Sequence, residues 1–172
     1  MAEPPFLSIV VAGRNDAYGG DFKARYVDAL RFNHEHLVAH DIPHELVLVE
    51  WNPVPNKPLL AELLASEFTE STMPVTVSYV VDRRYHDALT LNPYLTFLDY
   101  VAKNVGIRRA SGSFVLATNL DVLLGRHVLE ALASKQLEQR TVYRANLTGR
   151  PAVESNQVRT AGAPNISRRR PS

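Results

Sequence analysis

Four short apolar runs, rich in β-branched residues and closed by glycine, proline or polar residues, most constrain the fold of this chain. They cover residues 6–12, 45–51, 75–81 and 114–117. The run at 75–81 is typical of a strand, and those at 6–12, 45–51 and 114–117 are typical of strands that are buried on both faces, as in a parallel sheet. Because segments of helical periodicity separate the runs, the pattern predicts an α/β fold, with a Rossmann-like and mainly parallel sheet of about four strands and helices on both faces.

Helices are expected between and after these strands, because apolar residues recur there at the spacing of one helix face. Asp21 is placed to cap the first helix, and Pro43 follows its predicted end. The predicted helices cover residues 21–40, 59–68, 93–109 and 125–137.

The last part of the chain has a different composition. Residues 141–147 suggest an edge strand of uncertain direction. From there on, large apolar residues become scarce while Pro, Ser, Asn, Thr and Arg dominate. A segment of this kind buries too little surface to offset its ordering entropy. We therefore expect one domain at residues 1–148 and an irregular or mobile tail at residues 149–172.

The overall composition excludes several classes of protein. The 172 residues suffice for one domain with a substantial core, and 19 basic against 18 acidic residues predict no binding of nucleic acid. The absence of cysteine excludes disulfides and thiolate metal sites. No apolar run reaches the roughly 18 residues of a membrane helix. Residues 1–5 lack the features of a secretory signal, so we expect no membrane span and a cytoplasmic location.

Polar residues follow each predicted strand at the point where it ends. In open α/β sheets, ligands bind just beyond the carboxyl ends of the strands, so these residues are candidates for a binding site. Two further candidates lie four residues apart on the helix at 93–109 and therefore share one face of it. The candidates are Gly13, Arg14, Asn15, Asp16, Glu50, Asp82, Asn104, Arg108, Asn119 and Asp121.

Each candidate also has a purely structural interpretation. The segment from Gly13 to Asp16 could bring its backbone and Arg14 to a phosphate, or it could form a plain turn. Glu50 could be a strand-end carboxylate paired with an arginine, and Asp82 could form a surface ion pair with the arginines that follow it. Asp121 could bind a metal ion or cap the next helix.

Segment 103–121, K-N-V-G-I-R-R-A-S-G-S-F-V-L-A-T-N-L-D, carries the most specific pattern. With S-I-V-V in the first strand and V-L-V-E in the second, it resembles the nucleotide-sugar-binding half of family 2 glycosyltransferases of the GT-A fold, over roughly residues 6–125. The resemblance implies a UDP- or GDP-linked sugar as ligand and Glu50 as a contact of the nucleoside. It also implies Mn²⁺ or Mg²⁺ at a D-x-D-like motif, where this chain has Asn119-Leu120-Asp121. Asp121 and Asn119 are therefore the predicted metal ligands.

The resembling family continues into a second half that binds the acceptor and supplies the catalytic base. Only about fifty residues follow Asp121 here. We therefore predict a donor-binding half, with acceptor and catalytic residues unassigned. It could be a truncated product, a stand-alone binder of the sugar nucleotide, or an enzyme completed by a partner chain or a homo-oligomer. A non-catalytic α/β binding or scaffold module is the alternative, favoured by Asn119 at the first acidic position. A dinucleotide-dependent oxidoreductase is disfavoured, because Gly13-Arg14-Asn15-Asp16 stands where G-x-G-x-x-G is required.

Overall fold

The computed structural model describes residues 4–16, 21–69, 72–145 and 167–169. The chain forms two compact units, Met1–Leu123 and Leu124–Ser172. The predicted domain boundary between residues 148 and 149 lies outside the described residues and stays a prediction.

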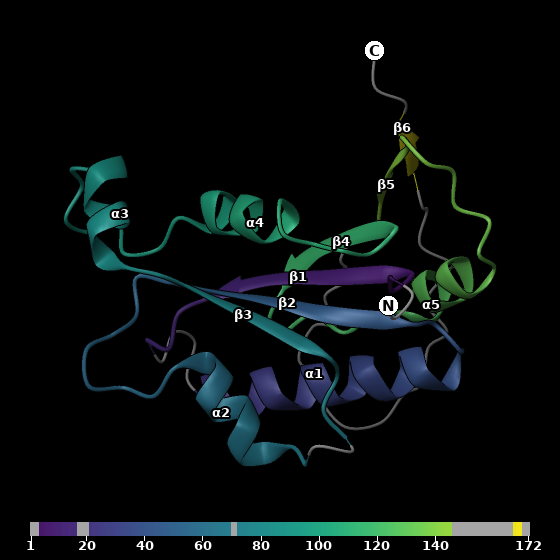
Figure 1. The fold of residues 1–172 in the computed structure, drawn as a ribbon, viewed down its shortest axis with the longest axis horizontal. Helices are drawn as coiled ribbons and strands as arrows, with labels where there is room; N and C mark the ends of the chain where they lie inside the picture. The colour runs from purple at the N-terminus through teal and green to yellow at the C-terminus, as the bar shows by residue number, and fades with distance from the viewer. Residues whose placement is uncertain (1–3, 17–20, 70–71, 146–166, 170–172) are drawn as a thin grey trace, which may run out of the picture. The chain divides into compact units, whose positions relative to one another are not determined.

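The first unit is built on a four-stranded sheet, shown in Figure 1. All neighbouring strands are parallel, and their order across the sheet is β3-β2-β1-β4. The strands are β1 (Leu7–Gly13), β2 (His44–Trp51), β3 (Thr76–Val81) and β4 (Phe114–Asn119). The predicted α/β fold with a four-stranded parallel sheet is thereby confirmed.

Helices cover both faces of this sheet, as predicted. α1 (Phe22–Ala39) and α2 (Leu60–Glu67) lie on one face, and α4 (Asp99–Ile107) lies on the other (Figure 1). Asp21 caps α1 by accepting the N–H of Ala24. From β1 to β3 each new strand is added on one side of the sheet. The segment between β3 and β4 then crosses the opposite face, and β4 is added on the other side of β1. The topological switch point, where α/β sheets bind ligands, therefore lies between β1 and β4.

One helix was not predicted, and another is shorter than predicted. α3 (Arg83–Leu89) begins directly after β3, where Asp82 caps it by accepting the N–H of Arg84 at 2.9 Å. The helix predicted at residues 93–109 begins only with α4, because the chain first turns at Asn92, whose Oδ1 accepts the N–H of Tyr94. None of the helices in the described ranges is long and apolar enough to cross a bilayer.

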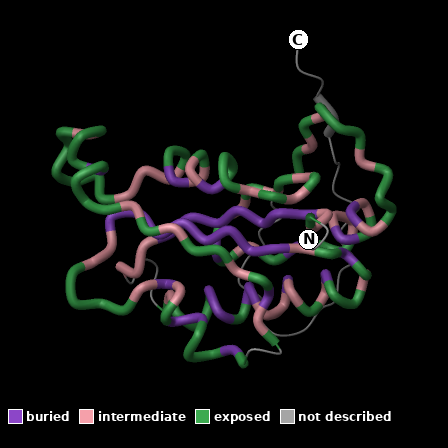
Figure 2. The backbone as a smooth tube through the Cα atoms, in the orientation of Figure 1, coloured by how far each residue is buried: buried purple, intermediate pink, exposed green. Residues whose placement is uncertain are grey.

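The two central strands form the core of the first unit. All of β1 and nearly all of β2 are buried, as the purple strands of Figure 2 show. β4 was predicted to be a buried strand, but it lies at the edge of the sheet and alternates half-buried with exposed residues. The reason is that α4 packs mainly on β1 and β2, so one face of β4 is poorly covered.

α4 approaches the sheet closely at Gly106. A Cβ on this residue would lie 2.5 Å from Val10 Cγ1 and 3.1 Å from Val49 Cγ2. Both valines are fully buried in the central strands. The glycine of the K-N-V-G-I segment is therefore needed for the packing of α4 against the sheet.

A buried carboxylate ties the amino ends of the strands to the turn between α4 and β4. Glu45 Oε1 accepts hydrogen bonds from the hydroxyl of Ser8 at 2.5 Å and from the N–H and hydroxyl of Ser111 at 2.8 and 2.9 Å. The N–H of Gly112 donates to the Ser8 hydroxyl at 2.8 Å. Burial alone would raise the pKa of Glu45, but the hydrogen bonds outweigh it and lower the pKa.

Two histidines connect α1 to the start of β2. His34 Nδ1 and His44 Nε2 lie 2.8 Å apart, and His44 Nδ1 lies 2.7 Å from the carbonyl oxygen of Ile42. Since that oxygen can only accept, Nδ1 of His44 carries a proton and its Nε2 accepts from His34. Burial lowers the pKa of both histidines, and for His34 the neighbouring His44 lowers it further.

Acidification is expected to destabilise the protein through this pair. Folding lowers the pKa of both histidines, so at pH values near and below about 6.5, the ordinary histidine pKa, the unfolded chain binds more protons than the folded protein. The free energy of unfolding therefore falls as the pH drops through this value. His34→Asn, whose amide nitrogen can take the place of Nδ1, should reduce this pH dependence between neutral and mildly acidic pH. Urea unfolding at a series of pH values measures it, with His40→Asn as the control. An unchanged slope in His34→Asn would contradict the assignment.

The second unit contains a helix and a small sheet. α5 (Arg126–Ala133) covers part of the helix predicted at residues 125–137. β5 (Val142–Arg144) pairs antiparallel with β6 (Ser167–Arg169), so the strand predicted at 141–147 belongs to a separate two-stranded sheet and not to the edge of the main one. Of the tail predicted to be irregular, only β6 is described, and it is a strand. The rest of that prediction lies outside the described residues.

Candidate functional site

The structure brings the predicted residues of all four strand ends to one edge of the sheet. The register pairs Gly13 of β1 with Glu50 of β2, and Ala12 of β1 with Asn119 of β4. Asp82 directly follows β3, and Asp121 lies two residues beyond the end of β4. Glu50 and Asp121 therefore lie at the same carboxyl edge, next to the topological switch point.

The space beside Gly13 is filled by protein. A Cβ on Gly13 would overlap Leu120 Cδ1 and lie 3.2 Å from Leu60 Cδ1. Asn15, which follows in the same loop, donates from Nδ2 to the carbonyl oxygen of Pro58 at 2.8 Å. The glycine thus accommodates the turn after β4, and the loop is attached to the segment before α2.

Arg14 is held in a fixed position by the loop that follows β2. Its Nε donates to the carbonyl oxygen of Asn52 at 2.6 Å, and its Nη1 lies 3.4 Å from Asp16 Oδ2. Asn52 is buried, has a positive φ of 49°, and donates from Nδ2 to the carbonyl oxygen of Thr96 at 3.0 Å. Two of the five guanidinium N–H groups of Arg14 are engaged in these contacts, and its side chain retains 15% exposure.

Glu50 is buried rather than presented to a ligand. Only 1% of the residue is exposed, and its Oε2 accepts the N–H of Leu60 at 2.6 Å, at the start of α2. Burial raises the pKa of Glu50, and the N–H groups of Leu60 and Asn15 offset this only in part. Tyr26 of α1 is also fully buried, and its pKa is raised by burial and by the nearby charge of Glu50. In this structure Glu50 therefore anchors α2, and its contact with a nucleoside stays a prediction.

The two predicted metal ligands each contact a basic side chain. Asn119 Oδ1 accepts a hydrogen bond from Lys103 Nζ at 2.6 Å, and the same ammonium group lies 2.9 Å from Asp99 Oδ2. Asp121 Oδ2 lies 2.6 Å from Arg25 Nη1. Lys103 belongs to α4 and Arg25 to α1, so the two cations come from helices on opposite faces of the sheet.

The contacts of this donor set do not favour a divalent cation. Mn²⁺ and Mg²⁺ prefer several converging oxygens of which at least one or two are carboxylates. Here one neutral amide and one carboxylate contact cations from opposite faces, and the described ranges contain no group of three or more His, Cys, Asp or Glu side chains suited to a metal ion. Metal binding by Asp121 and Asn119 stays a prediction that this geometry does not favour.

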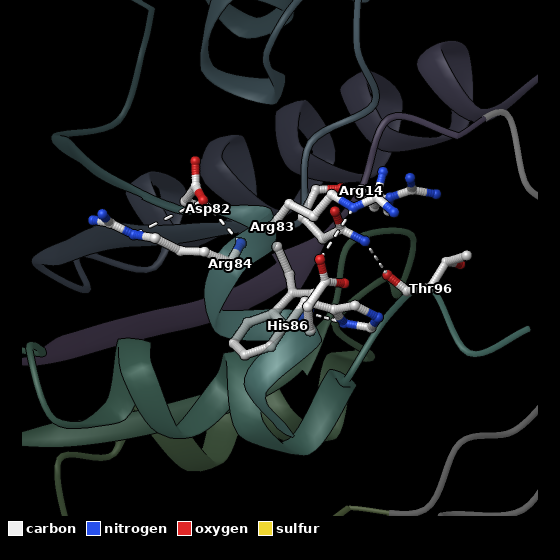
Figure 3. Close-up of polar contacts among 9 residues, drawn as sticks. Arg14, Asp82, Arg83, Arg84, His86 and Thr96 are labelled. Atoms are coloured by element: carbon white, nitrogen blue, oxygen red, sulfur yellow. Dashed lines mark hydrogen bonds and ion pairs between the residues drawn. The ribbon is translucent and has the colours of Figure 1, made fainter. Parts of the chain in front are cut away.

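Asp82 has a structural role at the end of β3. It caps α3, and its carboxylate also lies 3.9 Å from the guanidinium of Arg84, as the dashed lines in Figure 3 show. α3 in turn places His86, whose Nδ1 accepts the indole N–H of Trp51 at 3.0 Å. Trp51 is 1% exposed and belongs to the core. This corner of the edge therefore supports the fold around β2.

Asn104 and Arg108 are not brought to the carboxyl edge. α4 runs from that edge, where Lys103 contacts Asn119, toward the amino ends of the strands, where Ser111 contacts Glu45. Arg108 follows the last residue of α4, and both it and Asn104 are exposed. The residue of α4 that contacts the end of β4 is Lys103, so a shared ligand contact of Asn104 and Arg108 stays a prediction.

A small cavity lies between α1 and the sheet. Its lining includes Leu30, His34 and His44, and it reaches Asn119 and Leu120 at the end of β4. With a volume of about 10 Å³ it holds no more than a water molecule, because one probe sphere needs roughly 10–15 Å³. This cavity is therefore too small to be the binding site, and the candidate site is the carboxyl edge itself.

Three residues at the edge were missed in the sequence. Lys103 was not among the candidates, although Asp99 stands four residues before it, at the spacing of an ion pair along a helix. Arg25 carries no local signal, because its partner Asp121 is 96 residues away in the sequence. Asn52 is marked only by the N-P dipeptide, which predicts a turn but not its contacts.

No known family model matches the chain, and a comparison with curated proteins finds no significant match. The resemblance to family 2 glycosyltransferases therefore rests on the motifs named above.

Proposed function

We propose that the carboxyl edge of the sheet binds a nucleoside diphosphate sugar, UDP- or GDP-linked, and presents the sugar for transfer to an acceptor hydroxyl. One observation carries the proposal: loops from all four parallel strands meet at one edge beside the switch point, with Arg14, Arg25 and Lys103 contributing cations there. The order of the motifs along the chain supports the same ligand.

Arg14 is the residue best placed to hold a phosphate oxygen. Its guanidinium is oriented by Asn52 and Asp16, so little side-chain freedom remains to be lost on binding. Arginine N–H groups form short, charge-assisted hydrogen bonds to phosphate. In a transfer reaction, positive charge at this edge would stabilise the nucleoside diphosphate as it leaves the sugar.

A non-catalytic binding or scaffold module is the second candidate function. The observation in its favour is that the predicted site residues already contact other protein groups. Glu50 holds α2, Asp82 caps α3, and Asp121 pairs with Arg25. Side chains with these contacts can stabilise the fold without binding a small molecule.

Thermal unfolding with added ligands separates the two functions. UDP, GDP, their sugar conjugates and NAD are each added in excess to the purified chain. At about 100 times Kd a ligand stabilises the folded state by about 2.7 kcal/mol, which raises the midpoint by roughly 5–10 °C for a chain of this size. Stabilisation by a nucleoside diphosphate is expected. Stabilisation by none of these ligands would favour the scaffold, and stabilisation by NAD alone would contradict the proposal.

Two arginine variants test where the ligand lies. Arg14→Met should reduce the ligand-induced rise of the midpoint, because it removes the oriented guanidinium. Arg108→Met removes the same charge from the far end of α4 and should leave the rise unchanged. The midpoint without ligand is measured for both variants, so that a loss of stability is not mistaken for a loss of binding. Equal effects of the two variants would place the ligand elsewhere.

A further inference from the structure

The strongest further observation is the position of Lys103. Its side chain is only 14% exposed, although lysine side chains normally extend into solvent. It lies between Asp99 Oδ2 at 2.9 Å and Asn119 Oδ1 at 2.6 Å, beside the end of β4. An ammonium group has three N–H donors, and these two contacts use two of them.

The charge balance at the end of β4 differs from that of a metal site. A carboxylate at position 119 would place Lys103 between two negative groups and leave an excess of negative charge at this edge. The amide of Asn119 is neutral, so Lys103 contacts one carboxylate only, that of Asp99. The ammonium group therefore contacts Asn119 Oδ1, the same oxygen that the predicted metal site would use.

We infer that this site binds the diphosphate without a divalent metal, through the ammonium group of Lys103, with the Arg14 guanidinium of the proposed function as the other cation. The inference rests on the proposed function, since it names how the same site holds the phosphates. Asp99 and Asn119 hold Lys103 in place before the ligand binds, and a compact ammonium charge is a common partner of phosphate oxygens.

The experiment is a calorimetric titration of the full chain with UDP and GDP, in excess EDTA and again in excess Mn²⁺. Kd should differ by less than about threefold between the two conditions. Binding that requires Mn²⁺ would overturn the metal-free site but leave the proposed function standing. An absence of binding in both conditions would overturn the proposed function, and the inference with it.

Three variants make the test specific. Lys103→Met should weaken binding of UDP in EDTA by about tenfold or more, whereas Lys103→Arg should weaken it less, because it keeps the charge. Asn119→Asp adds a carboxylate beside the ammonium group, so it should weaken binding in EDTA and restore it with Mn²⁺. Unchanged affinity of Lys103→Met in EDTA would overturn the assignment.

Uridine serves as the matched ligand control. It lacks the phosphates, so its affinity should be the same for the original chain and for Lys103→Met. A parallel loss of uridine binding would mean that the substitution damages the fold of the edge. In that case the titrations of the original chain in EDTA and in Mn²⁺ decide, without any variant, whether binding of the diphosphate needs a metal.

Discussion

Gly106→Val is expected to lower the free energy of unfolding by about 3 kcal/mol, the upper end of the usual cost of overpacking a core. The first carbon of the new side chain would lie 2.5 Å from Val10 Cγ1, far inside van der Waals contact. Val10 and Val49 are fully buried in the two central strands and have no free space to move into. α4 must therefore move away from the sheet. Chemical denaturation followed by circular dichroism measures the loss.

The matched control is an alanine series on the same helix. Gly106→Ala improves helix propensity by about 1 kcal/mol but still brings a carbon against Val10, so a net destabilisation is expected. Asn104→Ala improves propensity at an exposed position and should be neutral or stabilising. If Gly106→Ala stabilised the protein as Asn104→Ala does, the close approach of α4 to the sheet would be wrong.

Glu45→Ala should be similarly damaging, with a loss of about 3 kcal/mol or more. The substitution removes the acceptor of two hydrogen bonds from Ser111 and of one from Ser8. Ser8 is fully buried, so its hydroxyl left without this acceptor costs about 1–3 kcal/mol, and the loss of the two hydrogen bonds from Ser111 adds to that cost. Glu45→Gln keeps an acceptor oxygen and removes the charge, so its loss should be smaller. Equilibrium unfolding of both variants gives the two values.

The pH dependence of stability identifies the charge of Glu45. Its pKa is lowered in the folded protein, so the stabilisation is present above the unfolded pKa of about 4.5 and disappears as pH falls through the folded value. Glu45→Gln should lack this acid-dependent decline. Glu35→Gln makes the same chemical change at an exposed position of α1 and serves as the control. If the free energy of unfolding fell equally with acidification in the original chain, in Glu45→Gln and in Glu35→Gln, the hydrogen-bond network of the buried Glu45 carboxylate would be refuted.

The strands were predictable because their sequence signal is local. Continuous apolar runs mark β1 and β2 wherever they lie in the sheet, and the alternation with helices implies parallel pairing. The burial of β4 was not predictable from its own residues, since it depends on the strand order and on where α4 packs. α3 has seven residues, too few to show helical periodicity, and only its cap Asp82 marks it.

The candidate site was predictable as an edge but not as a set of contacts. The carboxyl ends of parallel strands meet whatever their residues, which brings Glu50 and Asp121 together. Which polar groups face a ligand depends on contacts between distant segments of the chain. Such contacts bury Glu50, and they place Lys103 rather than Arg108 at the edge. In the segment that carries the resemblance, Gly106 and Gly112 are required by close packing, so part of that pattern reflects the fold rather than the ligand.

The position of β1 between β2 and β4 has a consequence for how the chain acquires its structure during synthesis. β1 emerges first, but its second neighbour is β4, and Leu7 pairs with Phe114. Until about residue 119 has left the ribosome, one hydrogen-bonding side of the most buried strand has no native partner. Pairing over so long a sequence separation is entropically slow, so a nascent chain stalled before β4 would expose an apolar strand that is prone to misassociation.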